Sequence, residues 1–222
     1  MSVIDQEQPT ATPEVVRAWV GGWAVSRSVR PPVEVTGGFR LDVGLPGHRV
    51  RYVLFDVDQV AELALTRTAP GTWIKTSAPA ERVVPLLTPA WTVGEPEYLM
   101  TVPLRRATAL APDGYTLHTA TDGGVTTVRI HDADGTTAAR GQIGVAGPAA
   151  VADQILTDPA HRRRGLGSVV MTALGDAAAE QGATTGVLGA SRDGLALYRA
   201  LGWTLCEVLT PAYIPEPDPA DA

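Results

Sequence analysis

The sequence Ile155-Leu156-Thr157-Asp158-Pro159-Ala160-His161-Arg162-Arg163-Arg164-Gly165-Leu166-Gly167-Ser168 predicts the end of a strand, a glycine-containing loop and the first turn of a helix. Gly165 and Gly167 lack a Cβ atom, so a ligand can approach the backbone closely there. The first N–H groups of the helix have no partners within it, and the helix dipole places partial positive charge at that end. Together with the arginines, this stretch predicts an anion-binding loop, most naturally for phosphate.

Two other interpretations of the loop compete with a phosphate site. A helix start with a solvated basic cluster has the same residues, and short glycine motifs often occur by chance. Nucleic-acid binding is a weaker rival, because the chain carries a formal net charge of -6 and three arginines in one loop do not make a basic face.

The residues after the loop predict a helix, a strand, a second helix and a final strand. Apolar residues recur at helical spacing from Val170 to Ala178, and Gly182 ends that helix. Residues 185–190 read as a short buried strand. The second helix is expected from about Asp193 to Gly202, and residues 203–208 form the last strand.

The residues before the loop predict antiparallel strands. Residues 115–120, 126–131 and 137–145 are expected to be strands joined by turns at 122–124 and 132–135. The second turn lacks the pattern and closing glutamate of a calcium loop, which favours a simple turn. Residues 149–157 are the next strand, and this strand runs into the loop.

Two motifs resemble those of the GCN5-related N-acetyltransferase (GNAT) superfamily. Residues 162–167, RRRGLG, fit the family's Q/R-x-x-G-x-G/A signature, and residues 197–203, LYRALGW, fit its L-Y-x-x-L-G-F/W segment. They stand in the family's order, with a helix and a strand between them. The resemblance covers residues 101–210 and implies a GNAT fold of the α/β (α+β) class, with a mixed, mostly antiparallel sheet flanked by helices.

The resemblance implies transfer of an acetyl group from acetyl-CoA, the cosubstrate, to a primary amine by direct attack within a ternary complex. A small-molecule amine is favoured as the acceptor. The pyrophosphate would contact backbone N–H groups from Arg163 to Ser168, and the pantetheine arm would add to the preceding strand like an extra strand. The expected cofactor-binding residues are Ile155, Leu156, Thr157, Arg162, Arg163, Arg164, Gly165, Leu166, Gly167, Ser168 and Ser191.

The resemblance also assigns catalytic roles. Tyr198 would protonate the leaving CoA thiolate, and its alternative role is that of a core tyrosine. Asp153 lies near the position where many family members carry a glutamate base, and a base that acts through water, or no base, is an equal alternative. Ser191 stands seven positions before the tyrosine, where the family often has asparagine. Because serine is shorter, this contact with pantetheine is a departure from the family pattern.

The first hundred residues predict another α/β unit, which opens with a helix whose N-cap is Thr12. A shift of 112 positions places Trp91 on Trp203 and the predicted helix 58–66 on residues 170–178. This unit is either a degenerate GNAT-like half without the phosphate loop or an unrelated subdomain. The expected organisation is an N-terminal subdomain at 1–100, a catalytic domain at 101–210 and a Pro- and acid-rich tail at 211–222.

The amino-acid composition indicates the broad class of protein. A hydrophobic fraction of 45% and a charged fraction of 19% are ordinary for a soluble globular protein. No signal peptide or membrane span is apparent, so a cytoplasmic monomer or homodimer without membrane or nucleic-acid partners is expected. The single cysteine excludes an internal disulfide, and four scattered histidines favour no metal site. The alternative function is a catalytically silent acyl-CoA-binding or regulatory module on the same fold.

Overall fold

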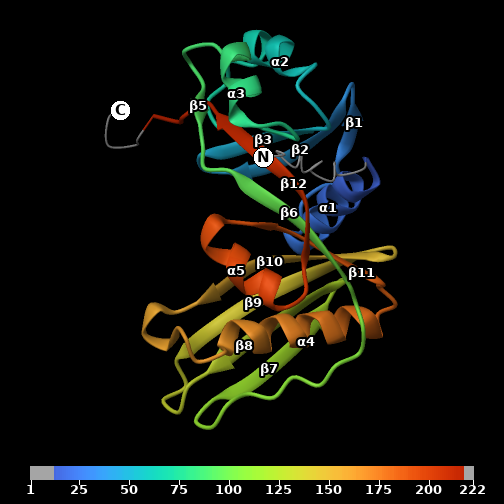
Figure 1. Ribbon diagram of the computed structural model, residues 1–222, viewed down its shortest axis with the longest axis vertical. Coiled ribbons are helices and arrows are strands. Elements are labelled where there is room, and N and C mark those ends of the chain that lie inside the picture. The colour runs from blue at the N-terminus through green and yellow to red at the C-terminus, as the bar shows by residue number, and fades with distance from the viewer. Residues whose placement is uncertain (1–12, 218–222) are drawn as a thin grey trace, which may run out of the picture.

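The computed structural model describes residues 13–217, and the strands in this range join into one mixed sheet (Figure 1). The strands are β1 (Val33–Val35), β2 (Gly38–Leu45), β3 (His48–Leu54), β4 (Thr72–Thr76), β5 (Thr92–Val93), β6 (Glu97–Pro103), β7 (Thr116–Asp122), β8 (Val125–His131), β9 (Thr137–Ala146), β10 (Ala149–Thr157), β11 (Thr185–Ala190) and β12 (Thr204–Tyr213). The helices are α1 (Pro13–Ser26), α2 (Val60–Thr66), α3 (Ala80–Val83), α4 (Leu166–Glu180) and α5 (Arg192–Ala200), with 3-10 turns η1 (Val84–Leu86) and η2 (Pro159–His161).

The strand order is β1-β2-β3-β4-β12-β6-β11-β10-β9-β8-β7, and β5 pairs with β12 beside this path. Within the described residues, β3 with β4 and β10 with β11 are the parallel pairs, and the other pairs are antiparallel. Helices cross between the strands of both parallel pairs, α2 in the first and α4 in the second. The predicted class, a mixed and mostly antiparallel sheet flanked by helices, is confirmed.

Two strands are shared between the N-terminal and C-terminal halves of the sheet. Residues 204–209 of β12 pair with β6, whereas residues 210–213 pair with β4, and the last two of these also pair with β5. Strand β6 follows the N-terminal half in the chain but lies between β11 and β12 in the C-terminal half. The predicted division at residue 100 therefore falls inside β6.

The predicted Pro- and acid-rich tail at 211–222 begins within strand β12. Strand β12 continues to Tyr213, and Ile214 is buried. Pro211 has no N–H to donate, but its carbonyl accepts a hydrogen bond from the Gly94 N–H at 2.9 Å. Glu216 then pairs with Arg49 at 2.5 Å. The chain stays ordered here because it completes the sheet of the other half, which the composition of this segment does not reveal.

The two halves contain their elements in a similar order. The first half reads β2-β3-α2-β4-α3-β5, and the second reads β9-β10-α4-β11-α5-β12. Each has an antiparallel pair, a crossover helix between parallel strands, a further helix and a closing strand. This order supports the interpretation of the first half as a degenerate GNAT-like unit, which remains our proposal. The predicted N-cap Thr12 lies outside the described residues.

Helix α1 packs between the two halves (Figure 1). Its buried residues Val16, Trp19, Val20 and Trp23 share one core with strand residues from both halves. That core also contains Phe39, Leu41, Val43, Val53, Leu99, Val151, Val187 and Leu209. Burial of this apolar face fixes the helix against the sheet, at about 25 cal/mol per Å² of apolar surface removed from water.

A close glycine contact sets the distance between α1 and the sheet. A Cβ atom at Gly22 would lie 2.9 Å from Val151 Cβ and 3.2 Å from the Gly144 carbonyl. A Cβ atom at Gly144 would lie 2.5 Å from the Ser26 N and the Gly22 carbonyl. Only glycine fits at both positions, so the two backbones meet directly and the C-terminal part of α1 is held against β9 and β10.

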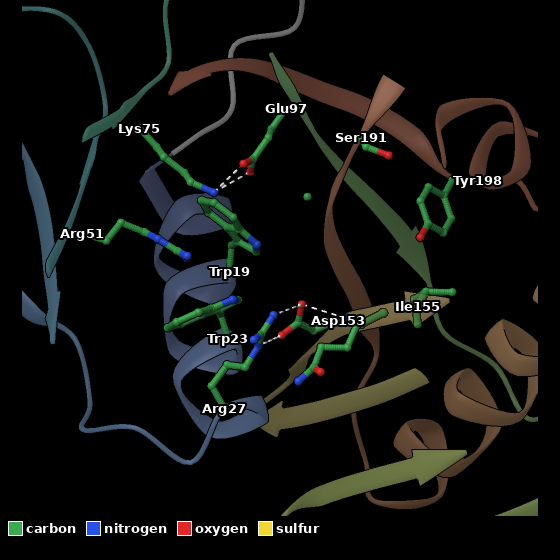
Figure 2. Close-up of a pocket in the computed structure, with 13 residues that line it drawn as sticks. Trp19, Trp23, Arg27, Arg51, Lys75, Glu97, Asp153, Ile155, Ser191 and Tyr198 are labelled. Atoms are coloured by element: carbon green, nitrogen blue, oxygen red, sulfur yellow. Dashed lines mark hydrogen bonds and ion pairs between the residues drawn. The ribbon is translucent and has the colours of Figure 1, made fainter. Parts of the chain in front are cut away.

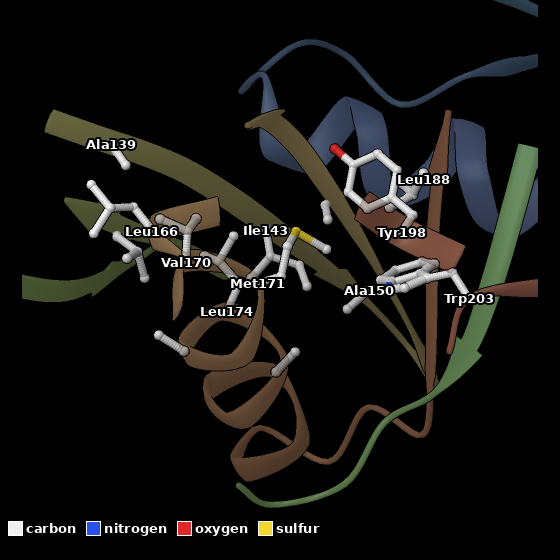
Figure 3. Close-up of a cluster of buried hydrophobic side chains, with 14 of the residues drawn as sticks. Ala139, Ile143, Ala150, Leu166, Val170, Met171, Leu174, Leu188, Tyr198 and Trp203 are labelled. Carbon is white, nitrogen blue, oxygen red and sulfur yellow. The ribbon is translucent and has the colours of Figure 1, made fainter. Parts of the chain in front are cut away.

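The second half has its own core beneath α4 (Figure 3). Leu166, Val170 and Leu174 follow one face of α4 and pack on Ile143 of β9 and its neighbours. No helix within residues 13–217 combines the length and apolar character that a membrane crossing requires.

Candidate active site

Strands β10 and β11 separate in the middle of the sheet. They pair over residues 149–151 and 185–187, and after that β10 continues with β9 while β11 continues with β6. The facing edges of residues 152–157 and 188–190 are therefore not joined to each other. Such an opening exposes backbone N–H and C=O groups to which an extended ligand can add as a strand.

A bulge in β10 lies at this opening. The pairing with β9 shifts in register between Asp153 and Leu156, and Gln154 has a φ of 54°. A bulge bends the strand and redirects its side chains. Of the residues expected to hold pantetheine, Ile155 lines the adjoining cleft, Leu156 is exposed, and Thr157 ends the strand. The period-two alternation in this stretch carries no signal for the bulge.

The predicted phosphate loop directly follows β10. Asp158 caps η2 by accepting a hydrogen bond from the Ala160 N–H at 2.9 Å, and α4 begins at Leu166. Within residues 13–217, no hydrogen bond uses the N–H groups of residues 163–167, whereas the Ser168 N–H donates to the Gly165 carbonyl at 3.0 Å. The backbone donors available to an anion are therefore residues 163–167, one fewer than the sequence predicts.

The two glycines of the loop serve different purposes. Gly165 has a φ of 79°, which side-chain-bearing residues rarely adopt, and a Cβ there would meet open space. Gly167 lies close to α5, because a Cβ would be 3.1 Å from Leu197 Cδ2. The first glycine shapes the loop, and the second lets the helix bearing Tyr198 pack against it.

The three arginines of the loop are exposed, and one of them belongs to a small polar network. Arg164 donates to the Tyr115 hydroxyl at 2.9 Å, and that hydroxyl lies 3.0 Å from His161 Nδ1. His161 Nε2 lies 3.5 Å from Asp132 in the β8–β9 turn. These contacts connect the loop to the antiparallel strands, while Arg162 and Arg163 remain exposed around the N-terminus of α4.

Tyr198 lies on α5 at the edge of the opening. Its ring is buried and packs edge-on against Trp203 at 6.1 Å, while its hydroxyl points into the cleft (Figure 2). Burial, together with the charge of Asp153, raises the pKa of Tyr198 to about 12. Gly194 makes room for the ring, since a Cβ there would lie 2.8 Å from Tyr198 Cε2.

Ser191 is the N-cap of α5. Its hydroxyl oxygen accepts a hydrogen bond from the Gly194 N–H at 3.3 Å, and the residue also lines the cleft. A serine N-cap of this kind satisfies one of the free donors at the helix start. The capping role accounts for the residue without any ligand, and its hydroxyl proton remains available to a bound group.

The opening continues into a cleft of about 350 Å³ between α1, the first half and the second half. Its lining residues are Trp19, Trp23, Arg27, Arg51, Lys75, Glu97, Ala152, Asp153, Gln154, Ile155, Gly189, Ser191 and Tyr198 (Figure 2). This cleft brings together both predicted catalytic residues, Asp153 and Tyr198. The phosphate loop lies beyond the end of β10.

Asp153 is engaged by Ser26, the last residue of α1, and by Arg27, which follows it. Arg27 Nε and Nη2 bind its two carboxylate oxygens, the second at 3.1 Å, and Ser26 lies 3.4 Å away. The carboxylate also accepts from the Gln154 N–H at 2.8 Å. Two of the three neighbours lie at the end of a helix far away in the sequence, so the sequence alone could not reveal this ion pair.

Besides Arg27, three further charged residues of the cleft were not predicted from the sequence. Lys75 donates to both carboxylate oxygens of Glu97, at 2.6 and 2.7 Å, and Arg51 lies over the ring of Trp23 at 4.1 Å. Burial is the main cause that lowers the pKa of Lys75 to about 8. The available signal was a cation within each of two otherwise buried strands, because lysine and arginine are rarely buried without a partner.

The fold and the cleft combine a splayed pair of parallel strands with a glycine loop at a helix start. The family model described as "Acetyltransferase (GNAT) domain" matches residues 114–205. Residues 114–205 are therefore similar to a GNAT acetyltransferase domain, in agreement with the two motifs. Members of this family generally use acetyl-CoA.

Solved structures share the fold over most of the chain. A GCN5-related N-acetyltransferase from Kribbella flavida is 17% identical, with a TM-score of 0.64, over 95% of this chain and 99% of that one. A putative GNAT-family acetyltransferase from Novosphingobium aromaticivorans is 16% identical, with a TM-score of 0.58, over 94% and 100%. A tandem GNAT protein from the clavulanic acid biosynthesis pathway is 14% identical, with a TM-score of 0.52, over 82% and 80%. No curated protein matches the sequence.

Proposed function

We propose that this protein transfers an acetyl group from acetyl-CoA to the primary amine of a small molecule within a ternary complex. One observation carries the proposal: the opening between β10 and β11 joins the glycine loop at one side to the cleft with Tyr198 and Asp153 at the other. The unpaired N–H groups of residues 163–167 suit a pyrophosphate, and the free edge of β10 suits an amide-containing arm.

In this proposal, each side chain has a defined task. The neutral amine attacks the thioester carbonyl carbon, a C–N bond forms, and the C–S bond breaks. Tyr198 gives its phenolic proton to the leaving sulfur and regains one from solvent. The proton of the incoming ammonium leaves through an ordered water to Asp153, because Arg27 occupies both carboxylate oxygens directly.

Calorimetric titration with acetyl-CoA tests the binding half of the proposal. Micromolar binding corresponds to about 8 kcal/mol, and Gly165→Glu should abolish it by placing a carboxylate in the phosphate site. Gly182→Glu is the matched control, because Gly182 also has a positive φ and open space but lies at the other end of α4. It should bind like the wild type.

Thiol release with a panel of amines tests the catalytic half. Turnover that requires both acetyl-CoA and an amine supports the enzyme. Binding of acetyl-CoA without turnover on any amine would support the alternative of a silent acyl-CoA-binding module. If the folded wild type does not bind acetyl-CoA, the loop is only the start of a helix and the proposal fails.

A further inference from the structure

The positive and negative charges of the residues that line the cleft do not balance. Arg27 is paired with Asp153, and Lys75 is paired with Glu97. Arg51 has no carboxylate within ion-pair distance among the residues that the structure describes. Three cations and two carboxylates therefore line the cleft, which leaves one positive charge in excess.

The Arg51 side chain is buried, and the two terminal nitrogens of its guanidinium face the cleft. Its exposed fraction is 6%, and its side chain extends from β3 toward the space beside Trp19 and Trp23 (Figure 2). Its Nε donates to His48 Nε2 at 3.0 Å. Within residues 13–217, no hydrogen bond uses Nη1 or Nη2. The two ends of the guanidinium are thus available as a fork for a planar anion.

His48 cannot neutralise this charge. Burial and the nearby Arg51 and Lys75 lower the pKa of His48 to about 3, so the ring stays neutral and serves as an acceptor. Burial also lowers the pKa of Arg51, to about 10, which leaves the guanidinium charged at neutral pH. A buried and unpaired cation destabilises the fold, so a partner supplied from outside the chain would offset this cost.

We infer that Arg51 binds a carboxylate of the acceptor, so that the substrate is an amine that also carries a carboxylate, such as an amino acid. The inference rests on the proposed function and names its substrate class. A carboxylate monoanion balances the single excess charge of the cleft, whereas a phosphate dianion would leave it negative. The fork formed by Nη1 and Nη2 matches the two carboxylate oxygens.

The arrangement of the cleft gives the substrate a direction. Arg51 and Tyr198 point into it from opposite sides (Figure 2). The carboxylate would lie at the Arg51 end, and the amine would lie toward Tyr198, where the thioester is expected. Trp19 and Trp23 provide an aromatic wall between them. A volume of about 350 Å³ is at the small end of ligand pockets and fits a small molecule.

The test compares matched amines that differ in the carboxylate. γ-Aminobutyrate is paired with n-butylamine, and phenylalanine with phenethylamine, and thiol release gives kcat/KM for each. The wild type should favour the carboxylated member by about 100-fold or more, the size expected when one side of a buried charge pair is removed. Arg51→Met should reduce this ratio to within a few-fold, and Arg51→Lys, which keeps the charge but loses the fork, should give an intermediate ratio.

Two controls show whether a change in this ratio is specific to Arg51. Arg40→Gln removes a partly exposed arginine on the neighbouring strand β2, where it pairs with Asp42, and should leave the ratio unchanged. Arg51→Met should melt at the same temperature as the wild type or higher, because it removes an unpaired buried charge. If Arg51→Met does not fold, Arg51→Lys still decides the question through its ratio.

A second measurement does not depend on turnover. Titration of tryptophan fluorescence with γ-aminobutyrate should saturate in the wild type, through Trp19 and Trp23, and should be weakened by about 100-fold in Arg51→Met. Equal binding by both proteins would overturn the inference. So would turnover without preference for the carboxylate, or a preference for O-phosphoethanolamine over β-alanine. Loss of acetyl-CoA binding would overturn the proposed function alone, because the fluorescence titration is made without acetyl-CoA.

Discussion

Tyr198 has the position and the protonation state that a proton donor to a thiolate requires. It lies at the edge of the opening between β10 and β11, and burial raises its pKa to about 12 from an ordinary value of 10. The folded protein therefore favours the protonated phenol, which remains available across the neutral and moderately alkaline range. This protonated form is the one that the proposed reaction uses.

We predict that Tyr198→Phe lowers kcat by about 10²- to 10⁴-fold, the usual contribution of a general acid, and leaves acetyl-CoA affinity nearly unchanged. Tyr213→Phe is the control, because Tyr213 stacks on Trp73 in the first half. Steady-state thiol release and calorimetry measure the two effects. A Tyr198→Phe rate within a few-fold of the wild type would reduce the residue to a core tyrosine.

The same residue predicts a pH dependence. Because the folded-state pKa lies above the ordinary value, the stability that Tyr198 contributes is present below about pH 10 and is lost as the pH rises toward 12. Ultraviolet titration of the phenolate, wild type minus Tyr198→Phe, should show one group that ionises well above pH 10. A difference curve centred at pH 10 would contradict this.

The residues of the site divide into those that a motif could reveal and those that it could not. Gly165, Gly167 and Tyr198 belong to short motifs whose local geometry explains their identity. Arg51 and Glu97 lie on strands far apart in the chain, and only the sheet brings both to the lining of one cleft. No local sequence pattern encodes the strand pairing that places them there. Only the structure therefore shows that both residues line the cleft.

At the scale of elements, α1 decides where one wall of the cleft lies. It carries Trp19 and Trp23, Arg27 directly follows it, and the close contact of Gly22 with Gly144 and Val151 holds it against the sheet. Adjacent glycines in this helix therefore have different neighbours. A Cβ at Gly21 would come no closer than 4.0 Å to another atom, that of Ala146, whereas one at Gly22 would overlap Val151.

We predict that Gly22→Ala destabilises the protein by about 1–3 kcal/mol, the usual cost of overpacking, and raises KM for the amine as α1 shifts. Gly21→Ala should instead stabilise by up to about 1 kcal/mol, because alanine favours a helix over glycine. Urea unfolding of both variants measures the difference. Equal stability of the two variants would mean that the helix can move away from the sheet without cost.

Periodicity predicted most elements, and it failed where pairing crosses the halves. Residues 149–157 form the predicted strand with the same bounds, since apolar alternation and the following loop define it locally. Strand β12 was predicted only to Val208 and extends to Tyr213. Its last residues read as a proline-containing tail because the edge that stabilises them belongs to β4 and β5.

For the whole molecule, the exchange of strands makes each half depend on the other. Residues 210–213 of β12 pair with β4, and the last two of them also pair with β5, while β6 lies between β11 and the first part of β12. The core around α1 also contains residues from both halves. Neither half of the sheet is complete without strands from the other half. The two halves should therefore unfold together, and the cleft between them keeps a fixed shape.

We predict one cooperative thermal transition. Ile74→Ala in the first half and Leu174→Ala in the second, both fully buried, should each cost about 2–5 kcal/mol and lower the same midpoint. Scanning calorimetry measures this, and the ratio of calorimetric to van't Hoff enthalpy should stay near unity in both variants. Two separated transitions, with Ile74→Ala moving one and Leu174→Ala moving the other, would mean that the halves are independent. The shared strands would then couple the two halves only weakly. Substrate binding between the halves would have to order the cleft before acetyl transfer.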